Sequence, residues 1–230
     1  VYKRQTGVFQ LESRVAQSTS RSLKPKRFED IVALVALIRP GPLGAGMHNE
    51  FADRANNRKE IEYLHNDLES ILNETYGVIL YQEQVMQIAE KIAGFNLQEA
   101  DNLRVAMGKK IPKVMEEQRK KFTDGSVSNN YSEQFAIELF DQIAYFAGYG
   151  FNKSHSVPYA LLAYQTAYLK ANYPAEYIAA CLTAVKRDKD RTAIFLSEAR
   201  DLGVKVSTPD INLSSSDFTV NDNEILFGLS

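Results

Sequence analysis

The chain has 230 residues, of which 44% are hydrophobic and 24% are charged, so it can bury a core as one large or two small domains and is not a generally disordered protein. Its formal net charge of -2 excludes a uniformly basic nucleic-acid-binding protein, so any contact with nucleic acid must come from local basic patches. The single cysteine, Cys181, excludes a disulfide within the chain, and its apolar helical surroundings predict a buried structural thiol.

Helical periodicity dominates most of the chain. A helix is predicted over residues 28–38, and the segment RPGP at residues 39–42 stops it. Asn96, followed three residues later by Glu99, predicts a capped start for another helix. In chain order, further helices are predicted over residues 80–93, 96–108, 112–125, 132–146, 157–171, 174–185 and 190–202, and residues 126–130 are predicted to form a polar loop.

The C-terminal end departs from this helical pattern. Residues 204–206 and 217–227 have the composition of short strands, and the polar triplet NDN at residues 221–223 supplies a turn within the second segment. The sequence therefore predicts a mainly α protein with a few short β-strands at its C-terminal end. We expect a helical domain over residues 1–203 and the start of a small β-containing subdomain, truncated, over residues 204–230.

No N-terminal stretch resembles a signal peptide, and no apolar run approaches the roughly 18 residues that a membrane span needs. These features predict a cytoplasmic protein without a membrane segment. The chain begins with Val1 instead of methionine and ends on a strand-like pattern, so we expect it to be a fragment of a much longer protein.

The segment AGYGFNKSHS at residues 147–156 runs directly into an apolar helical pattern. Its two glycines permit a tight loop, which we expect to enter the helix without a strand. Ser154 or Ser156 can cap the helix, and Pro158 suits its first turn.

Two cations, Lys153 and His155, lie at this predicted helix start. The helix dipole disfavours cations there, so their presence predicts an anion nearby, and phosphate is the natural candidate. The alternative interpretations are a solvated lysine and a hydrogen-bonded core histidine.

A second basic region surrounds a turn between two predicted helices. It can present several cations to a polyanion, although such a run is also typical of a solvated helix face. It consists of Arg104, Lys109 and Lys110 around Gly108, followed by Lys113, Arg119, Lys120 and Lys121. The region is not a Walker A loop, because Lys110 stands where that loop needs serine or threonine and Leu103 stands where it needs a glycine. ATPase activity is therefore not supported.

The segment GYGFNKSHS at residues 148–156, together with Tyr159 and Tyr164 downstream, closely resembles the fingers domain of the bacterial replicative DNA polymerase III alpha subunit, a C-family DNA polymerase. Five further blocks resemble the same family in the same order, namely TGVFQLES (6–13), ALVALIRPGPL (33–43), YGVILYQEQVM (76–86), AMGKK (106–110) and PDIN (209–212). Together they cover nearly the entire chain.

The resemblance implies a multi-helix fingers domain that begins just after the palm domain. It implies that the whole protein is a template-directed DNA polymerase, a nucleotidyltransferase of bacterial DNA replication. This region would bind the incoming deoxynucleoside triphosphate and the primer-template DNA. A sliding clamp and other replisome subunits would bind through regions outside this chain.

The same resemblance implies which residues bind ligands. Nucleotide binding is expected at Arg39, Arg104, Asn152, Lys153, Ser154 and His155, and DNA binding at Lys109, Lys110 and Lys113. The family usually has a second arginine after the one at Arg104, and here Val105 stands in that place. Either Arg104 acts alone where a pair usually acts, or the pair matters less than the resemblance suggests.

Polymerase chemistry requires divalent metal ions held by neighbouring carboxylates. The Asp-x-Asp sequence of this chain, Asp188-Lys189-Asp190, lies at a predicted helix start, where aspartates cap the helix and oppose its dipole. In the resembled family the metal-binding aspartates belong to the palm. We therefore expect Mg²⁺ to bind outside this chain, no catalytic or metal-binding residue within it, and no activity of the chain alone.

Two other function classes compete with this interpretation. A non-enzymatic helical module could hold partner proteins or nucleic-acid backbone through its basic turns. A metal-dependent nuclease is disfavoured because the chain lacks a carboxylate constellation and its three histidines, His48, His65 and His155, are widely spread.

Overall fold

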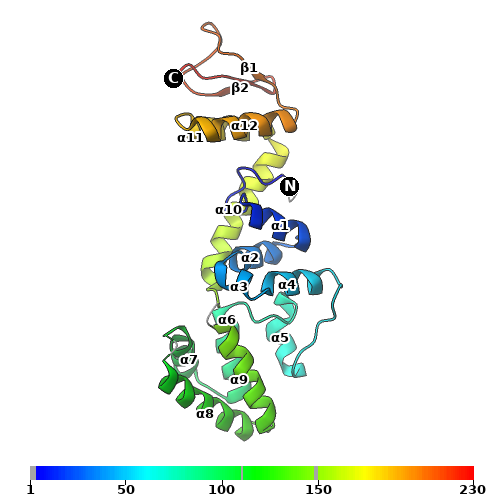
Figure 1. The fold of residues 1–230 in the computed structure, drawn as a ribbon, viewed down its shortest axis with the longest axis vertical. Helices are drawn as coiled ribbons and strands as arrows, with labels where there is room; N and C mark the ends of the chain where they lie inside the picture. Colours follow the sequence, from blue (N-terminus) through cyan, green and yellow to red (C-terminus); the bar gives the residue numbers. More distant parts are fainter. Residues whose placement is uncertain (1–3, 110, 148–149) are drawn as a thin grey trace. The chain divides into compact units, whose positions relative to one another are not determined.

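The computed structural model describes residues 4–109, 111–147 and 150–230, and helices dominate them (Figure 1). The mainly α prediction is therefore confirmed. The helices are α1 (Arg14–Leu23), α2 (Phe28–Leu37), α3 (Pro40–Gly44), α4 (Met47–Ala55), the short 3-10 turn η1 (Asn66–Leu68), α5 (Glu69–Leu72), a second 3-10 turn η2 (Asn73–Thr75), α6 (Gln82–Ala93), α7 (Leu97–Lys109), α8 (Pro112–Ser128), α9 (Glu133–Ala147), α10 (Lys153–Asn172), α11 (Pro174–Val185) and α12 (Lys189–Asp201).

The start of α10 differs from the prediction. The helix begins at Lys153, several residues before the predicted start, and Asn152 caps it because its Oδ1 accepts the His155 N–H at 2.8 Å. Neither Ser154 nor Ser156 is the cap, and Pro158 lies inside the helix. Asparagine, serine and proline are all typical of helix starts, so the local pattern alone does not choose among them.

The end of α8 also differs, because the helix continues to Ser128 through most of the predicted loop at residues 126–130. The Ser126 hydroxyl donates to the carbonyl of Phe122 at 2.8 Å, and the Ser128 hydroxyl donates to that of Asp124 at 2.9 Å. Such bonds to the preceding turn allow polar residues to remain helical. Asn129 then ends the helix, and its side chain donates to the carbonyl of Ile92 at 3.0 Å.

Contacts between residues divide the chain into two compact units, Thr19–Ala160 and the combination of Val1–Ser18 with Leu161–Ser230. The boundary predicted between residues 203 and 204 remains a prediction.

In the first unit, α6 packs against α7 and α8, and α8 packs against α9. Helix α6 buries residues spaced by three and four positions, which form one continuous apolar face, namely Val85, Ile88, Ala89 and Ile92. The cap predicted for α7 is confirmed by reciprocal hydrogen bonds between Asn96 and Glu99 at 2.9 and 3.0 Å.

Gly125 of α8 lies directly on the end of α6, and a Cβ at this position would overlap the carbonyl oxygen of Ala93. We expect Gly125→Ala to lower the free energy of unfolding by about 1–3 kcal/mol, although alanine is the better helix former, because backbone atoms cannot move aside as a side chain can. Gly108→Ala is the matched control, since nothing lies within 4 Å of a Cβ on that helical glycine. It should be neutral or stabilise by up to about 1 kcal/mol. Urea unfolding of both variants checks this, and equal effects would contradict it.

The second unit has its own core, in which α11 and α12 pack together and against a three-stranded sheet. Strand β3 (Glu224–Leu226) is central, parallel to β1 (Val206–Ser207) and antiparallel to β2 (Thr219–Asn221). The predicted turn is confirmed, because Asp222 and Asn223 between β2 and β3 have φ values of 47° and 62°, the left-handed conformation of a tight hairpin.

The lone cysteine of this unit, Cys181, is a free thiol that packs against the core but is only half-buried, where a buried structural thiol was predicted. Burial raises its pKa, which disfavours a reactive thiolate.

No helix in the described part of the chain is both long and apolar enough to cross a membrane.

Candidate nucleotide-binding site

The loop before α10 is attached to the segment before α6. The Phe151 N–H donates to the carbonyl of Leu80 at 3.1 Å, and the Gln82 N–H donates to the carbonyl of Phe151 at 2.9 Å. Tyr81 and Phe151 thereby form a parallel β-bridge, and the Gln82 side chain adds a bond to the carbonyl of Gly150 at 3.1 Å. Among the described residues 150–152 no strand precedes α10, as expected, and this one isolated bridge fixes the start of α10 beside the start of α6.

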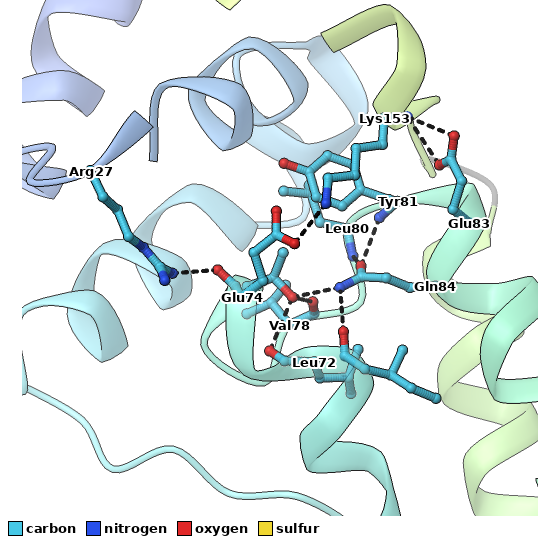
Figure 2. A network of polar contacts seen from close by, with 11 residues as sticks. Arg27, Leu72, Glu74, Val78, Leu80, Tyr81, Glu83, Gln84 and Lys153 are labelled. Carbon is cyan, nitrogen blue, oxygen red and sulfur yellow. Dashed lines mark hydrogen bonds and ion pairs between the residues drawn. The ribbon is translucent and has the colours of Figure 1, made fainter. Parts of the chain in front are cut away.

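Gln84 holds the other side of this junction in place (Figure 2). Its buried Oε1 accepts the N–H groups of Leu80 and Tyr81 at 2.8 and 2.9 Å. Its Nε2 donates to Thr75 Oγ1 at 2.7 Å and to the carbonyl of Ile71 at 3.3 Å. The amide is satisfied on both sides, and such a buried network rigidifies its surroundings. Sequence reasoning missed Gln84, because nothing local distinguishes it from its neighbours.

The structure brings four of the predicted nucleotide ligands to this junction. The Arg39 guanidinium lies 4.1 Å from the centre of the Phe151 ring, and the His155 ring lies 5.5 Å from the same ring. Arg104 Nη1 reaches Gln82 Oε1 at 3.4 Å, and Lys153 Nζ lies 5.6 Å from the Tyr81 ring. Residues from α7, α10 and the turn after α2 therefore converge on one place. Whether they bind a nucleotide remains a prediction.

Each of the two groups of Lys153 that can bind an anion already contacts a carboxylate. Its backbone N–H donates to both oxygens of Glu83 at 3.0 Å, so the anion at the start of α10 is supplied by α6 (Figure 2). Its Nζ contacts Glu74 Oε2 at 2.6 Å. The anions at this helix start are carboxylates of the protein itself. Whether a phosphate also binds there remains a prediction.

The remaining predicted nucleotide ligands have different surroundings. Asn152 and Ser154 are exposed, and Asn152 is engaged as the cap of α10. The exposed His155 ring contacts two aromatic rings: it is edge-on to Phe151, and its centroid lies 4.5 Å from that of Tyr159. The interpretation of His155 as a buried core histidine is therefore wrong.

The profile of the bacterial DNA polymerase III alpha subunit finger domain matches residues 2–130. The chain belongs to this family. Similarity to proteins named DNA polymerase III subunit alpha extends over 97% of the chain: that of Mycobacterium tuberculosis (strain H37Rv) is 48% identical over 227 residues, that of Saccharopolyspora erythraea 49% over 228 residues, and that of Escherichia coli (strain K12) 49% over 230 residues. The chain spans only 19% to 20% of the length of these relatives.

The predicted DNA-binding lysines of this finger domain lie around the connection between α7 and α8. Lys109, at the end of α7, and Lys113, in the first turn of α8, are both exposed, while Lys110 lies outside the described residues. Further along α8 the basic run is partly neutralised, because Arg119 pairs with Asp141 and Lys121 pairs with Glu99. Lys109 and Lys113 therefore remain the better candidates for contact with a polyanion.

The Asp-x-Asp sequence at residues 188–190 caps a helix, as predicted. Asp188 caps α12, and its Oδ1 accepts the Arg191 N–H at 3.0 Å. Among residues 4–109, 111–147 and 150–230, no group of three histidine, cysteine or acidic side chains could hold a metal ion. The binding of Mg²⁺ in a palm domain remains a prediction.

Proposed function

We propose that this finger domain binds the triphosphate of the incoming deoxynucleotide and the primer-template DNA within a template-directed DNA polymerase. The observation that carries the proposal is the convergence of Arg39, Arg104, Lys153 and His155 on the junction between residues 80–82 and 151. Cations fixed on rigid elements stabilise the charge that develops on a transferred phosphoryl group and its leaving pyrophosphate. The junction supplies such rigidity through its β-bridge and the buried Gln84 amide.

The rest of the proposal concerns the whole polymerase. Mg²⁺ binds to palm carboxylates outside this chain, and a sliding clamp and other replisome subunits bind elsewhere on the protein, in the bacterial cytoplasm. The chain alone does not extend a primer. Its own contribution is to bind and orient the triphosphate and the template end, because its cations converge on one junction.

Triphosphate binding is tested by competition in the whole polymerase on a primed template. A correct nucleotide should bind saturably and be displaced by other triphosphates, and substitution of Lys153 or His155 by alanine should weaken this binding. If these variants instead lose affinity for long polyanions and keep their affinity for nucleotides, the domain is a helical interaction module without nucleotide chemistry.

DNA binding by the isolated chain should be weak and strongly dependent on salt, because it rests on a few lysines in a chain with a net charge of -2. Lys113→Ala should reduce the slope of log affinity against log salt concentration by about 0.9, the value for one lost phosphate contact. Lys189→Ala, on the exposed start of α12, is the control. Fluorescence anisotropy across salt concentrations measures the slopes, and a flat response would identify these lysines as solvated.

A further inference from the structure

The contact between Lys153 and Glu74 is made by a fixed part of the backbone. Glu74 lies in η2, where its carbonyl accepts a hydrogen bond from Arg27 Nη2 at 2.6 Å (Figure 2). The next residue, Thr75, is bonded through its hydroxyl to the carbonyl of Val78 at 2.6 Å and to the Gln84 amide at 2.7 Å. These hydrogen bonds fix the backbone that carries the Glu74 carboxylate toward Lys153 Nζ. An ordinary surface ion pair has no such fixed backbone.

Two polar atoms beside this pair lack a hydrogen-bond partner among the described residues. One is Glu74 Oε1, the carboxylate oxygen that does not contact Lys153, and the other is the hydroxyl of Tyr81. The Tyr81 side chain is only 1% exposed, and its ring lies beside Lys153 Nζ (Figure 2). Burial, and after it the charge of Glu74, raises the pKa of Tyr81, so the hydroxyl stays protonated and can donate. An unmet acceptor and an unmet donor thus occupy the same small region.

We propose, on the basis of the nucleotide site proposed above, that Glu74 is an internal competitor of the triphosphate for Lys153, and that the Tyr81 hydroxyl takes over the Glu74 carboxylate when Lys153 turns to a phosphate. In the free enzyme Glu74 holds Nζ. In the nucleotide complex Nζ contacts phosphate oxygen, and the carboxylate gains a buried donor in place of the cation. In the bound state the exchange gives the buried Tyr81 hydroxyl an acceptor and the Glu74 carboxylate a donor, since an unpaired buried group is costly.

The exposure of the pair determines the size of the effect. The side chains of Lys153 and Glu74 are 36% and 31% exposed, so solvent screens their attraction. An ion pair of this kind changes an equilibrium constant by at most about fivefold. A triphosphate carries several negative charges and displaces one carboxylate at this cost. Glu74 therefore weakens the binding of every triphosphate by a small constant factor.

The experiment uses the whole polymerase and measures the dissociation constant of dTTP opposite template adenine by single-turnover incorporation. Glu74→Gln should tighten dTTP binding roughly two- to fivefold, because the amide holds the lysine less strongly. Tyr81→Phe should weaken binding by a similar factor when Glu74 is present and have a smaller effect in the Glu74→Gln background, because a neutral amide oxygen gains less from the hydroxyl. Glu69→Gln, the same change of charge on an exposed position of α5, is the control and should leave the constant unchanged.

Lys153→Ala separates the two proposals. It should weaken dTTP binding and abolish the effect of Glu74→Gln, since the competitor then has nothing to hold. If Lys153→Ala weakens dTTP binding but Glu74→Gln leaves dTTP binding unchanged or weakens it, Glu74 is not a competitor, and the proposed nucleotide site is supported. If Lys153→Ala has no effect, the nucleotide site itself is overturned. Melting temperatures of all variants establish that they fold, and Glu74→Ala, which also removes the carboxylate, repeats the test if the glutamine variant does not fold.

Discussion

Replacement of Lys170 by methionine should lower the free energy of unfolding of this chain by about 3–5 kcal/mol. The Nζ of Lys170 donates to Glu198 Oε1 at 2.7 Å and to the carbonyls of Arg4 and Thr6 at 3.0 and 2.7 Å. The side chains of Lys170 and Glu198 are 3% and 10% exposed, so methionine would leave a buried carboxylate and two carbonyls without their donor. This is the large penalty for breaking a buried pair on one side only.

Urea unfolding measures the effect, with Lys189→Met as the matched control. Lys189 is an exposed lysine at the start of α12, and its replacement should stay within about 0.5 kcal/mol. The double variant Lys170→Met with Glu198→Leu should recover much of the loss, because it removes both buried charges. If Lys170→Met alone unfolds like the control, the ion pair does not hold the N-terminal segment on α10.

The second large effect is on catalysis by the whole polymerase. Lys153→Ala should remove a charge-assisted phosphate contact of roughly 1.5–3 kcal/mol and lower the efficiency of nucleotide incorporation by at least about tenfold. Its melting temperature should barely move, because alanine keeps the backbone N–H that donates to Glu83 and the lost Glu74 pair is half-exposed. Steady-state and single-turnover kinetics on a primed template provide the measurement.

His155→Ala should have the same direction of effect, because the exposed ring lies at the same junction. Lys189→Ala, far along the sequence on an exposed helix start, should change neither kinetics nor stability. A strong fall in melting temperature for Lys153→Ala, with unchanged dependence on triphosphate concentration, would mean that the lysine is structural and that the phosphates bind elsewhere.

Helices and turns whose signals lie within a few residues were predictable from the sequence. The reciprocal bonds of Asn96 and Glu99, the capping Asp188 and the left-handed Asp222 and Asn223 all follow from side chains that act on their own backbone neighbours. The start of α10 was not predictable from the sequence, since several neighbouring residues are equally typical of helix starts. There the bridge to residue 81 and the Glu83 carboxylate decide where the helix begins.

The sequence by itself determined the helical class, the C-terminal hairpin, the family and the cations of the candidate site, because each depends on local pattern or on whole motifs. Only the tertiary structure decided what those cations touch. Glu83 and Glu74 contact Lys153 from 70 and 79 positions away, and Glu198 lies 28 positions from Lys170. The partner of a charged group is chosen by the packing of distant elements, and buried pairing of this kind has no local sequence signal.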